Sequence, residues 1–172
     1  MNTTEPTHTF QYLFHPIPIG LALLATMNRK VRFLYLGQDE PSLLQLVRDA
    51  CPKKRLSPLA ENETSSYCNW INSLICPARP GHDIAIAPSG TPFQESVWRY
   101  LLTIPRGEVR SYSDVAKGIG NERATRAVAN ACGRNPISLA IPCPRVVREG
   151  GALGGYRWGM EKKQWLLDHE QR

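Results

Sequence analysis

The sequence lacks a hydrophobic run long enough to cross a membrane. Its longest apolar stretch, residues 17–25, is interrupted by Pro18 and Gly20, and a membrane-spanning helix needs about 20 mostly apolar residues. It also lacks a basic segment followed by an apolar core and a small-residue cleavage site, which would mark a secretory signal. We therefore expect an intracellular protein without a membrane partner, located in the cytoplasm or, in a eukaryotic cell, in the nucleus.

Paired cysteine motifs are also absent. The chain has five cysteines and no C-x-x-C pair, which argues against a disulfide framework and favours a reducing compartment. Three of these cysteines and two histidines might suggest metal ligands, but their spacing matches no zinc pattern. These residues are His15, Cys51, Cys68, Cys76 and His82. We expect neither a metal site nor a cofactor.

Positive charge is unevenly distributed along the 172 residues. Residues 1–90 carry 8 Lys and Arg against 7 Asp and Glu, a net charge of +1, whereas residues 91–172 carry 13 against 8, a net charge of +5. A basic half joined to a neutral half is typical of a protein whose basic half meets a polyanion. A solvated basic surface would give the same excess, so charge alone leaves both interpretations open.

The best candidate for a domain boundary is Pro88-Ser89-Gly90. We expect an α+β chain, with a small α/β domain over residues 1–88 and a mainly helical domain over residues 89–172. In the first domain, the apolar runs predict a hairpin with Asn28 in its turn, followed by two short helices. The predicted elements are strands at 21–26 and 31–36, helices at 42–50 and 66–75, a loop at 52–65 and an edge strand at 83–87.

The second domain opens with a strong helix start. Thr91 is a good N-cap, Pro92 suits the first helical position, and Gln94 can close a capping box. Its predicted apolar stripe comprises Phe93, Val97, Trp98, Leu101 and Leu102. Similar patterns predict helices from Ser111, over about 122–131 and over about 160–169. The second and third helices, joined by a glycine turn, are typical of a winged helix-turn-helix-like DNA-binding domain.

The third of these helices has two distinct faces. Its apolar positions recur with the helical period and are predicted to face the core: Ala124, Ala127, Val128 and Ala131. Its opposite side carries polar residues, Arg123, Arg126, Asn130 and Arg134. Small neighbouring side chains would let such a face approach a nucleic-acid groove. An ordinary solvated helix face would have the same spacing.

A cysteine framed by two prolines follows, in the sequence Ile-Pro-Cys-Pro-Arg at 141–145. Each proline ring fixes its own φ and restricts the residue before it, so Cys143 lies on a rigid turn. Such a turn can present a nucleophilic thiol, although a lone cysteine is more often a buried structural residue. A glycine-rich loop at 150–159 comes directly after this turn.

Several motifs together resemble the active-site half of the O6-alkylguanine-DNA alkyltransferases, also called methylated-DNA–protein-cysteine methyltransferases. They are Asn135-Pro136, Ile141-Pro142-Cys143, Arg145-Val146-Val147, Gly155-Tyr156-Arg157-Trp158-Gly159 and the tail from Lys163 to Glu170. The resemblance covers about half the chain. It implies DNA repair by irreversible transfer of a methyl or larger alkyl group from O6-alkylguanine to Cys143, with O4-alkylthymine as a further candidate lesion. Each molecule would act once, because a thioether is not hydrolysed.

The resemblance also implies residue roles. Tyr112 would assist nucleotide rotation and protonate the leaving guanine, Asn135 would support the turn that carries Cys143, and Glu170 would belong to the relay that ionises the thiol. The basic helix would lie in the minor groove of double-stranded DNA as part of a monomer, and Arg126 would fill the gap left by the flipped guanine. The implied DNA-contacting residues are Arg123, Arg126, Asn130, Arg134, Arg145 and Tyr112. The implied base pocket comprises Val146, Gly154, Gly155, Tyr156 and Arg157.

One position departs from the family pattern. The family has His immediately after the reactive Cys, and this chain has Pro144. A free thiol has a pKa near ~8.5 and needs help to ionise at neutral pH, which in the family comes through a water from that His. His169 lies about 100° around the helix from Glu170 and is a poor substitute. Arg145 and other cations of the basic half could lower the thiol pKa instead.

Three functions are therefore compatible with the sequence. The first is a DNA-repair alkyltransferase slowed by the loss of the His. The second is a non-reactive relative that binds and flips alkylated guanine as a damage marker, and the third is a winged-helix regulator. The regulator leaves the proline-framed cysteine unexplained. We favour the first because the nucleophile is present, and losing a general base costs a factor of ~10²–10⁴ without abolishing the reaction.

Overall fold

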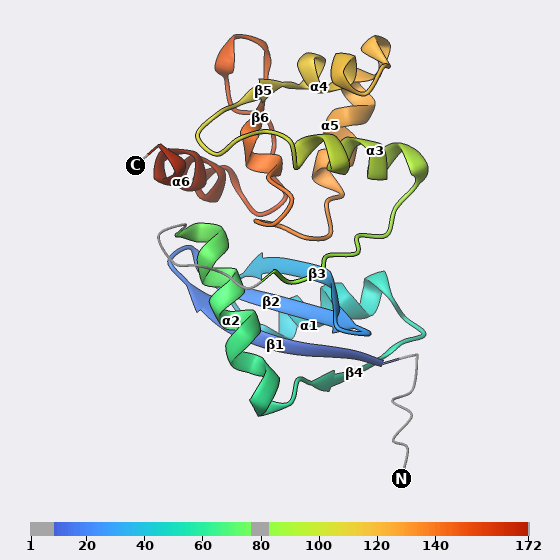
Figure 1. Ribbon diagram of the computed structural model, residues 1–172, viewed down its shortest axis with the longest axis vertical. Helices are drawn as coiled ribbons and strands as arrows, with labels where there is room; N and C mark the ends of the chain where they lie inside the picture. Colours follow the sequence, from blue (N-terminus) through green and yellow to red (C-terminus); the bar gives the residue numbers. More distant parts are fainter. Residues whose placement is uncertain (1–8, 77–82, 172) are drawn as a thin grey trace. The chain divides into compact units, whose positions relative to one another are not determined.

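The computed structural model describes residues 9–76 and 83–171. The chain divides into two compact units, Met1–Pro88 and Ser89–Arg172, called here the N-terminal and C-terminal units (Figure 1). Among the described residues, no helix combines the length and apolarity needed to cross a membrane.

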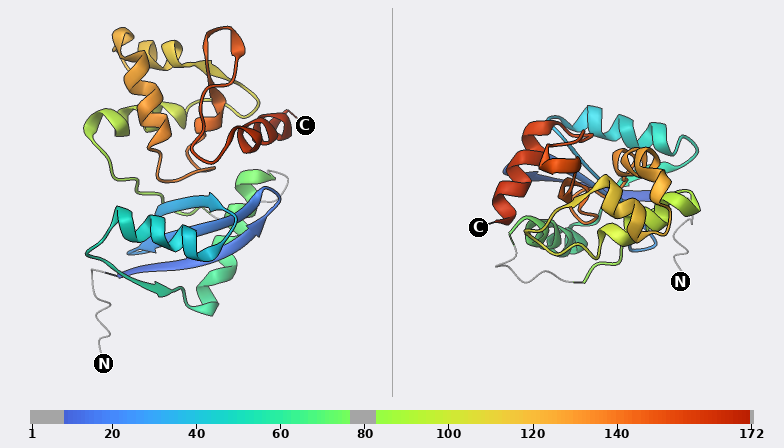
Figure 2. Two further views of the ribbon diagram at one scale, coloured as in Figure 1. Left: turned by 180° about the vertical axis from the view of Figure 1, so that it is seen from behind. Right: turned by 90° about the horizontal axis from the view of Figure 1, so that it is seen from above.

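The N-terminal unit is built on a four-stranded sheet in the order β3-β2-β1-β4. The strands β1 (Thr9–Ile17), β2 (Gly20–Met27) and β3 (Lys30–Gly37) are antiparallel neighbours, and β4 (Arg55–Pro58) pairs parallel with β1. Helices α1 (Glu40–Ala50) and α2 (Glu61–Ile75) cover opposite faces of this sheet (Figures 1 and 2). The central strand β2 is therefore buried on both faces, and Ala22 to Ala25 have no exposed surface.

Local sequence explains the hairpin and the first helix. Asn28 and Arg29 adopt left-handed backbone conformations, with φ of 53° and 59°, as the favoured two-residue hairpin turn requires. Helix α1 begins at Glu40 because the Asp39 carboxylate accepts a hydrogen bond from the Ser42 amide at 2.9 Å. The predicted hairpin and first helix are confirmed.

The prediction of a loop at 52–65 is wrong. This segment contains β4 and the first turn of α2, which begins at Glu61 without a side-chain N-cap, so no capping residue marks the start of the helix. Strand β1 adds a further element to those predicted, and the polar residues 1–8 before it lie outside the described residues. The predicted edge strand at 83–87 is only a single bridge between Ile86 and Val31.

The C-terminal unit is mainly helical. It contains α3 (Pro92–Leu101), α4 (Tyr112–Gly118), α5 (Thr125–Gly133) and α6 (Met160–Glu170), with α3, α4 and α5 packed on one another. Two short parallel strands, β5 (Arg110–Ser111) and β6 (Val146–Val147), pair beside them. Three 3₁₀ turns complete the unit: η1 (Glu122–Ala124), η2 (Cys143–Arg145) and η3 (Glu149–Gly151).

The helix starts predicted at Thr91 and Ser111 are confirmed, whereas α5 begins at Thr125, after the predicted start at about Glu122. Two predicted core positions are wrong. Complete capping boxes begin α3 at Thr91 and α4 at Ser111. Leu102 is 49% exposed because it lies about 100° around the helix from Leu101, at the edge of the buried face formed by Val97, Trp98 and Leu101. Ala127 is exposed because it lies about 100° around α5 from Val128, at the edge of the buried face. The buried stripe of α5 is Val128, Ala131 and Cys132.

Candidate active site

The proline-framed turn is held closed by one amide side chain. Cys143 begins η2 and is 4% exposed. The buried Asn135 amide donates to the Cys143 sulfur at 3.0 Å and to the Ile141 carbonyl at 2.9 Å, and its oxygen accepts from the Ile137 amide at 2.9 Å. A single side chain thus joins both ends of the loop and fixes the position of the thiol.

The surroundings of Cys143 favour the neutral thiol. Burial raises the pKa of the Cys143 thiol well above its usual value, and the neighbouring Cys132 thiol raises it further. The hydrogen bond from Asn135 and the charge of Lys163 lower the same pKa without offsetting burial. The resting site therefore holds a protonated sulfur at neutral pH.

Lys163 is a functional candidate that the sequence reasoning missed. It is 1% exposed, and its Nζ donates to the Val146 carbonyl at 2.6 Å. Burial lowers the pKa of Lys163, whereas the two nearby thiols raise it. Its helical spacing with the buried residues Leu166 and Leu167 was the available signal, because an ion at an apolar position is rarely accidental.

Glu170 has a different partner from the one implied by the resemblance. Its carboxylate binds Arg145 in a two-pronged ion pair, with Nε–Oε2 at 2.9 Å and Nη2–Oε1 at 3.0 Å. The Arg145 Nη1 donates to the Ile104 carbonyl at 2.7 Å. Arg145 therefore has internal partners, and its contact with DNA stays a prediction. The cation that lowers the Cys143 pKa is Lys163. His169 stacks on Trp165, with ring centroids 4.6 Å apart.

Tyr112 begins α4 and is half-buried. Burial raises the pKa of its phenol to about 12, with a smaller opposing effect from Arg148, so the phenol keeps its proton at neutral pH. A Cβ on Gly154 would lie 2.3 Å from the Tyr112 hydroxyl. Gly154 was predicted to let the backbone approach the flipped base, and the structure shows that the Tyr112 ring already needs the space that a side chain there would fill. A Cβ on Gly155 would meet open space.

Two further pocket candidates, Tyr156 and Arg157, occupy different surroundings. The Tyr156 hydroxyl is buried and lies near the Ser138 hydroxyl, but the geometry falls short of a hydrogen bond. Ser138 accepts a hydrogen bond from the Trp158 indole, and the Arg157 guanidinium stacks over that indole at 4.7 Å. Val146 is fully buried and contributes its carbonyl to Lys163. Tyr156 therefore brings an unpartnered polar atom toward the thiol, whereas Arg157 packs on Trp158.

A pocket of about 540 Å³ opens beside Tyr112. It brings together four residues predicted from sequence and three that were not predicted. Its lining residues are Tyr112, Thr125, Arg126, Ala129, Arg148, Gly154 and Gly155. Asn130 is exposed on α5, and so are Arg123 on the preceding turn η1 and Arg134 at the C-cap of α5. Among the residues that the structure describes, no three His, Cys, Asp or Glu side chains come together as metal ligands, and His82 lies outside this part of the chain.

Known proteins are similar to the C-terminal unit alone and to most of the chain. Residues 92–172 match the family model described as "6-O-methylguanine DNA methyltransferase, DNA binding domain". A methylated-DNA–protein-cysteine methyltransferase of Methanosarcina barkeri is 49% identical over 154 residues, covering 90% of this chain and 92% of the relative. The chain belongs to the methylated-DNA–protein-cysteine methyltransferase family.

Other relatives define the extent of this similarity. The bifunctional transcriptional activator/DNA repair enzyme Ada of Escherichia coli is 36% identical over 163 residues, covering 93% of this chain and 45% of Ada. The chain thus spans about half the length of the first curated family members it matches. The crystal structure of the Mycobacterium tuberculosis O6-methylguanine methyltransferase aligns with a TM-score of 0.76 at 34% identity, covering 94% of this chain and 93% of that one. The predicted α+β fold is confirmed.

Proposed function

We propose that this protein repairs DNA by transferring an alkyl group from O6-alkylguanine directly and irreversibly to its own Cys143. The observation that carries the proposal is the buried Cys143 turn, with its sulfur 3.0 Å from the Asn135 amide, inside the unit that matches the family's DNA-binding domain. The family membership of the chain supports the reaction class.

The chemistry is a displacement at the alkyl carbon. The Cys143 thiolate attacks that carbon, so a sulfur–carbon bond forms as the bond between O6 and carbon breaks. The thiol proton passes to water, and the departing guanine takes a proton from the Tyr112 phenol, which is then reprotonated by solvent. Asn135 and Lys163 stabilise the thiolate, because a donated N–H and a nearby cation both favour the charged form.

Binding of double-stranded DNA is assigned to the exposed face of α5. Arg126 and Asn130 are exposed on this helix, and Arg123 of η1 and Arg134 of the C-cap are exposed at its two ends. The N-terminal half of α5 lines the pocket through Thr125, Arg126 and Ala129. A structural relative, the M. tuberculosis OGT, has been solved in complex with DNA. We assign this helix to the minor groove of the duplex, bound by one protein molecule, with Arg126 filling the gap left by the flipped guanine.

Activation of the thiol is assigned to groups other than a histidine. Pro144 supplies no imidazole, and the carboxylate of Glu170 is engaged by Arg145. The charge of Lys163 and the Asn135 amide are the groups that favour the thiolate. Reaction at neutral pH therefore proceeds through a small ionised fraction of Cys143, in an intracellular compartment that keeps the thiol reduced.

Mass spectrometry of the intact protein tests this function. After incubation with a duplex that contains O6-methylguanine, we expect one added methyl group per molecule, located on Cys143 by peptide mapping, and no addition in Cys143→Ala. Tight binding of the lesion without any added mass at neutral or alkaline pH would instead support the non-reactive damage-marker function.

A further inference from the structure

Two side chains leave the same end of the parallel pair β5–β6. Ser111 of β5 is the register partner of Val147 of β6, so the next residues along the chain, Tyr112 and Arg148, emerge side by side. Both line the pocket, and Arg148 is close enough to lower the pKa of the Tyr112 phenol. The position of Arg148 is therefore built into the strand pairing.

The loop that carries Arg148 is fixed at several points. The Arg148 amide donates to the Ala152 carbonyl at 2.8 Å, and the Gly151 amide donates to the Arg148 carbonyl at 3.0 Å. Gly150 and Gly151 make this tight return possible through φ values of 78° and 85°. The Ser113 hydroxyl of α4 donates to the Glu149 carboxylate, which ties the loop to the helix that begins with Tyr112.

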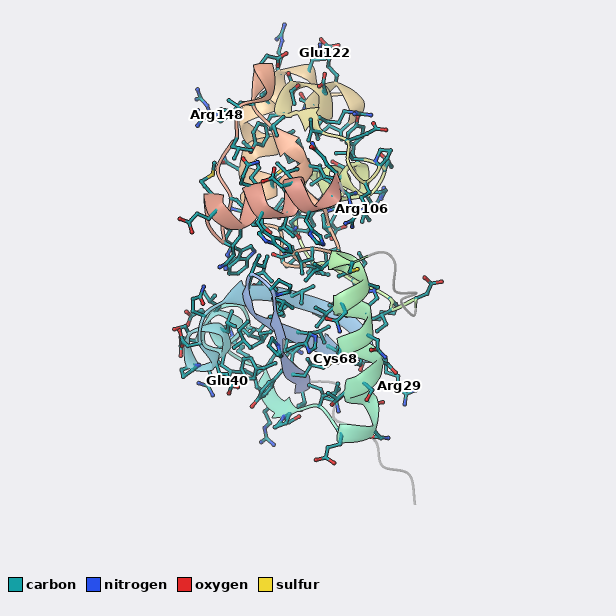
Figure 3. All side chains as sticks on the ribbon, turned by 90° about the vertical axis from the view of Figure 1, so that its left-hand side faces the viewer. Arg29, Glu40, Cys68, Arg106, Glu122 and Arg148 are labelled. Atoms are coloured by element: carbon teal, nitrogen blue, oxygen red, sulfur yellow. The ribbon has the colours of Figure 1, made fainter. Side chains whose placement is uncertain are left out.

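The Arg148 side chain is exposed at the outer edge of the C-terminal unit (Figure 3). Arg126 of α5 lines the same pocket, and the lining residues include no acidic side chain. The pocket is therefore bordered by two guanidinium groups from separate elements. A guanidinium presents paired N–H donors that match the oxygens of a phosphate.

We propose that Arg148 binds a phosphate next to the flipped nucleotide, at the pocket that it lines together with Arg126. This inference rests on the proposed function and adds a DNA-positioning residue to it. A phosphate held by Arg148 anchors the backbone of the extruded nucleotide beside Tyr112, while Arg126 occupies the space that the base has left. The flipped base is then held in place by Arg148 at its own backbone phosphate and by Arg126 in the space that it has left in the base stack.

The test pairs protein variants with neutralised phosphates. Single-turnover alkyl transfer is measured on duplexes in which one phosphate flanking O6-methylguanine, on its 5′ or its 3′ side, is replaced by an uncharged methylphosphonate. A duplex with the replacement several nucleotides away is the control. We expect Arg148→Ala to lower the rate at subsaturating protein by about 10- to 100-fold on the unmodified duplex, as for a charged hydrogen bond. On one of the two flank-modified duplexes, the one whose neutral phosphate is the partner of Arg148, the same substitution should have little further effect on the rate.

A matched variant separates this contact from general charge. Arg123 is exposed on η1 and is absent from the pocket lining. Arg123→Ala should therefore slow transfer by the same factor on every duplex, whichever phosphate is replaced by a methylphosphonate. Arg148→Lys should retain part of the rate, because lysine binds phosphate as a point charge. Arg148→Ala should also reduce the slope of log affinity against log salt by about 1.

Two results would overturn the assignment of Arg148. The first is that Arg148→Ala slows transfer by the same factor on every duplex. The second is that Arg148→Ala slows the reaction with a free O6-alkylguanine base as much as the reaction with the duplex, which would show that Arg148 acts through Tyr112. Equilibrium binding by Cys143→Ser repeats the same comparison without chemistry. A wild-type protein that is never alkylated refutes the proposed function, whereas the binding comparison still decides whether Arg148 contacts the phosphate.

Discussion

The two units bury different kinds of side chain. Among the described residues, the N-terminal unit buries one polar side chain, Thr26, whereas the C-terminal unit buries Ser111, Asn135, Ser138 and Lys163. A buried polar group costs free energy unless it is hydrogen-bonded, and a buried ion costs more. The N-terminal unit is therefore organised for stability, whereas the C-terminal unit accepts a less favourable interior that places amide, hydroxyl and ammonium groups around a thiol.

Cysteine substitutions in the two units should differ most in their effect on alkyl transfer. Cys143→Ala should abolish alkyl transfer, because the sulfur is the acceptor. Simultaneous replacement of Cys51, Cys68 and Cys76 by Ser should leave transfer intact, since these residues belong to the N-terminal unit and are partly exposed. Single-turnover transfer measured by mass spectrometry checks both variants. A correctly folded triple variant without activity would show that the N-terminal unit takes part in the chemistry.

The pH dependence of alkyl transfer tests whether burial in the C-terminal unit raises the pKa of Cys143. Because the Cys143 pKa is raised, the wild-type rate should climb about tenfold per pH unit from about pH 7 to about pH 9, as the thiolate fraction grows. Pro144→His should speed transfer at neutral pH by on the order of 10² and move the profile to lower pH, because it adds a general base.

Pro144→Ala is the control for this experiment, since it removes the ring without adding an imidazole. The new His must compete with Arg145 for Glu170, so Arg145→Lys should enhance its effect. A wild type that is already fast at pH 7, and gains nothing from the His, would show that existing groups fully activate Cys143.

The duplex requirement distinguishes the DNA face from the thiol site. Arg126→Ala should slow repair of duplex DNA about 30-fold, because extruding a paired base costs a few kcal/mol that Arg126 helps to offset. Its reaction with a free O6-alkylguanine base should change far less, since there is no gap to fill. Parallel rate measurements on both substrates test this, and equal losses would remove Arg126 from base flipping.

The smallest expected effects are on the free energy of unfolding, when one ion pair in each unit is weakened. Arg145 and Glu170 have side chains 16% and 13% exposed, whereas Arg29 and Glu63 are 86% and 30% exposed. Glu170→Gln should lower the free energy of unfolding by about 1–2 kcal/mol, because it weakens a largely buried pair. Glu63→Gln should cost less than about 0.5 kcal/mol. Urea unfolding measures both, and equal losses would show that burial does not distinguish these pairs.

Sequence reasoning succeeded where the determining contacts are local. The capping boxes at Thr91 and Ser111 lie within four residues, and the hairpin turn at Asn28 depends on two. It failed for α2, whose N-cap residue Ala60 has no side chain that could cap the helix. It also failed where partners are distant, because the Arg145–Glu170 pair spans 25 residues. Arg148 could not be placed next to Tyr112 without the β5–β6 register. The resemblance supplied Asn135, and its contact with the Cys143 sulfur required coordinates.

Helix α6 imposes an order on biosynthesis. It supplies both Lys163, which binds the carbonyl after the Cys143 turn, and Glu170, which binds Arg145 of that turn. These residues are translated after every other group of the site. Domains generally fold as units during synthesis, the N-terminal one first, and the last strand of the N-terminal sheet ends at Pro58. A nascent chain can therefore complete its sheet early, while its thiol stays in an unfinished turn until α6 has emerged from the ribosome.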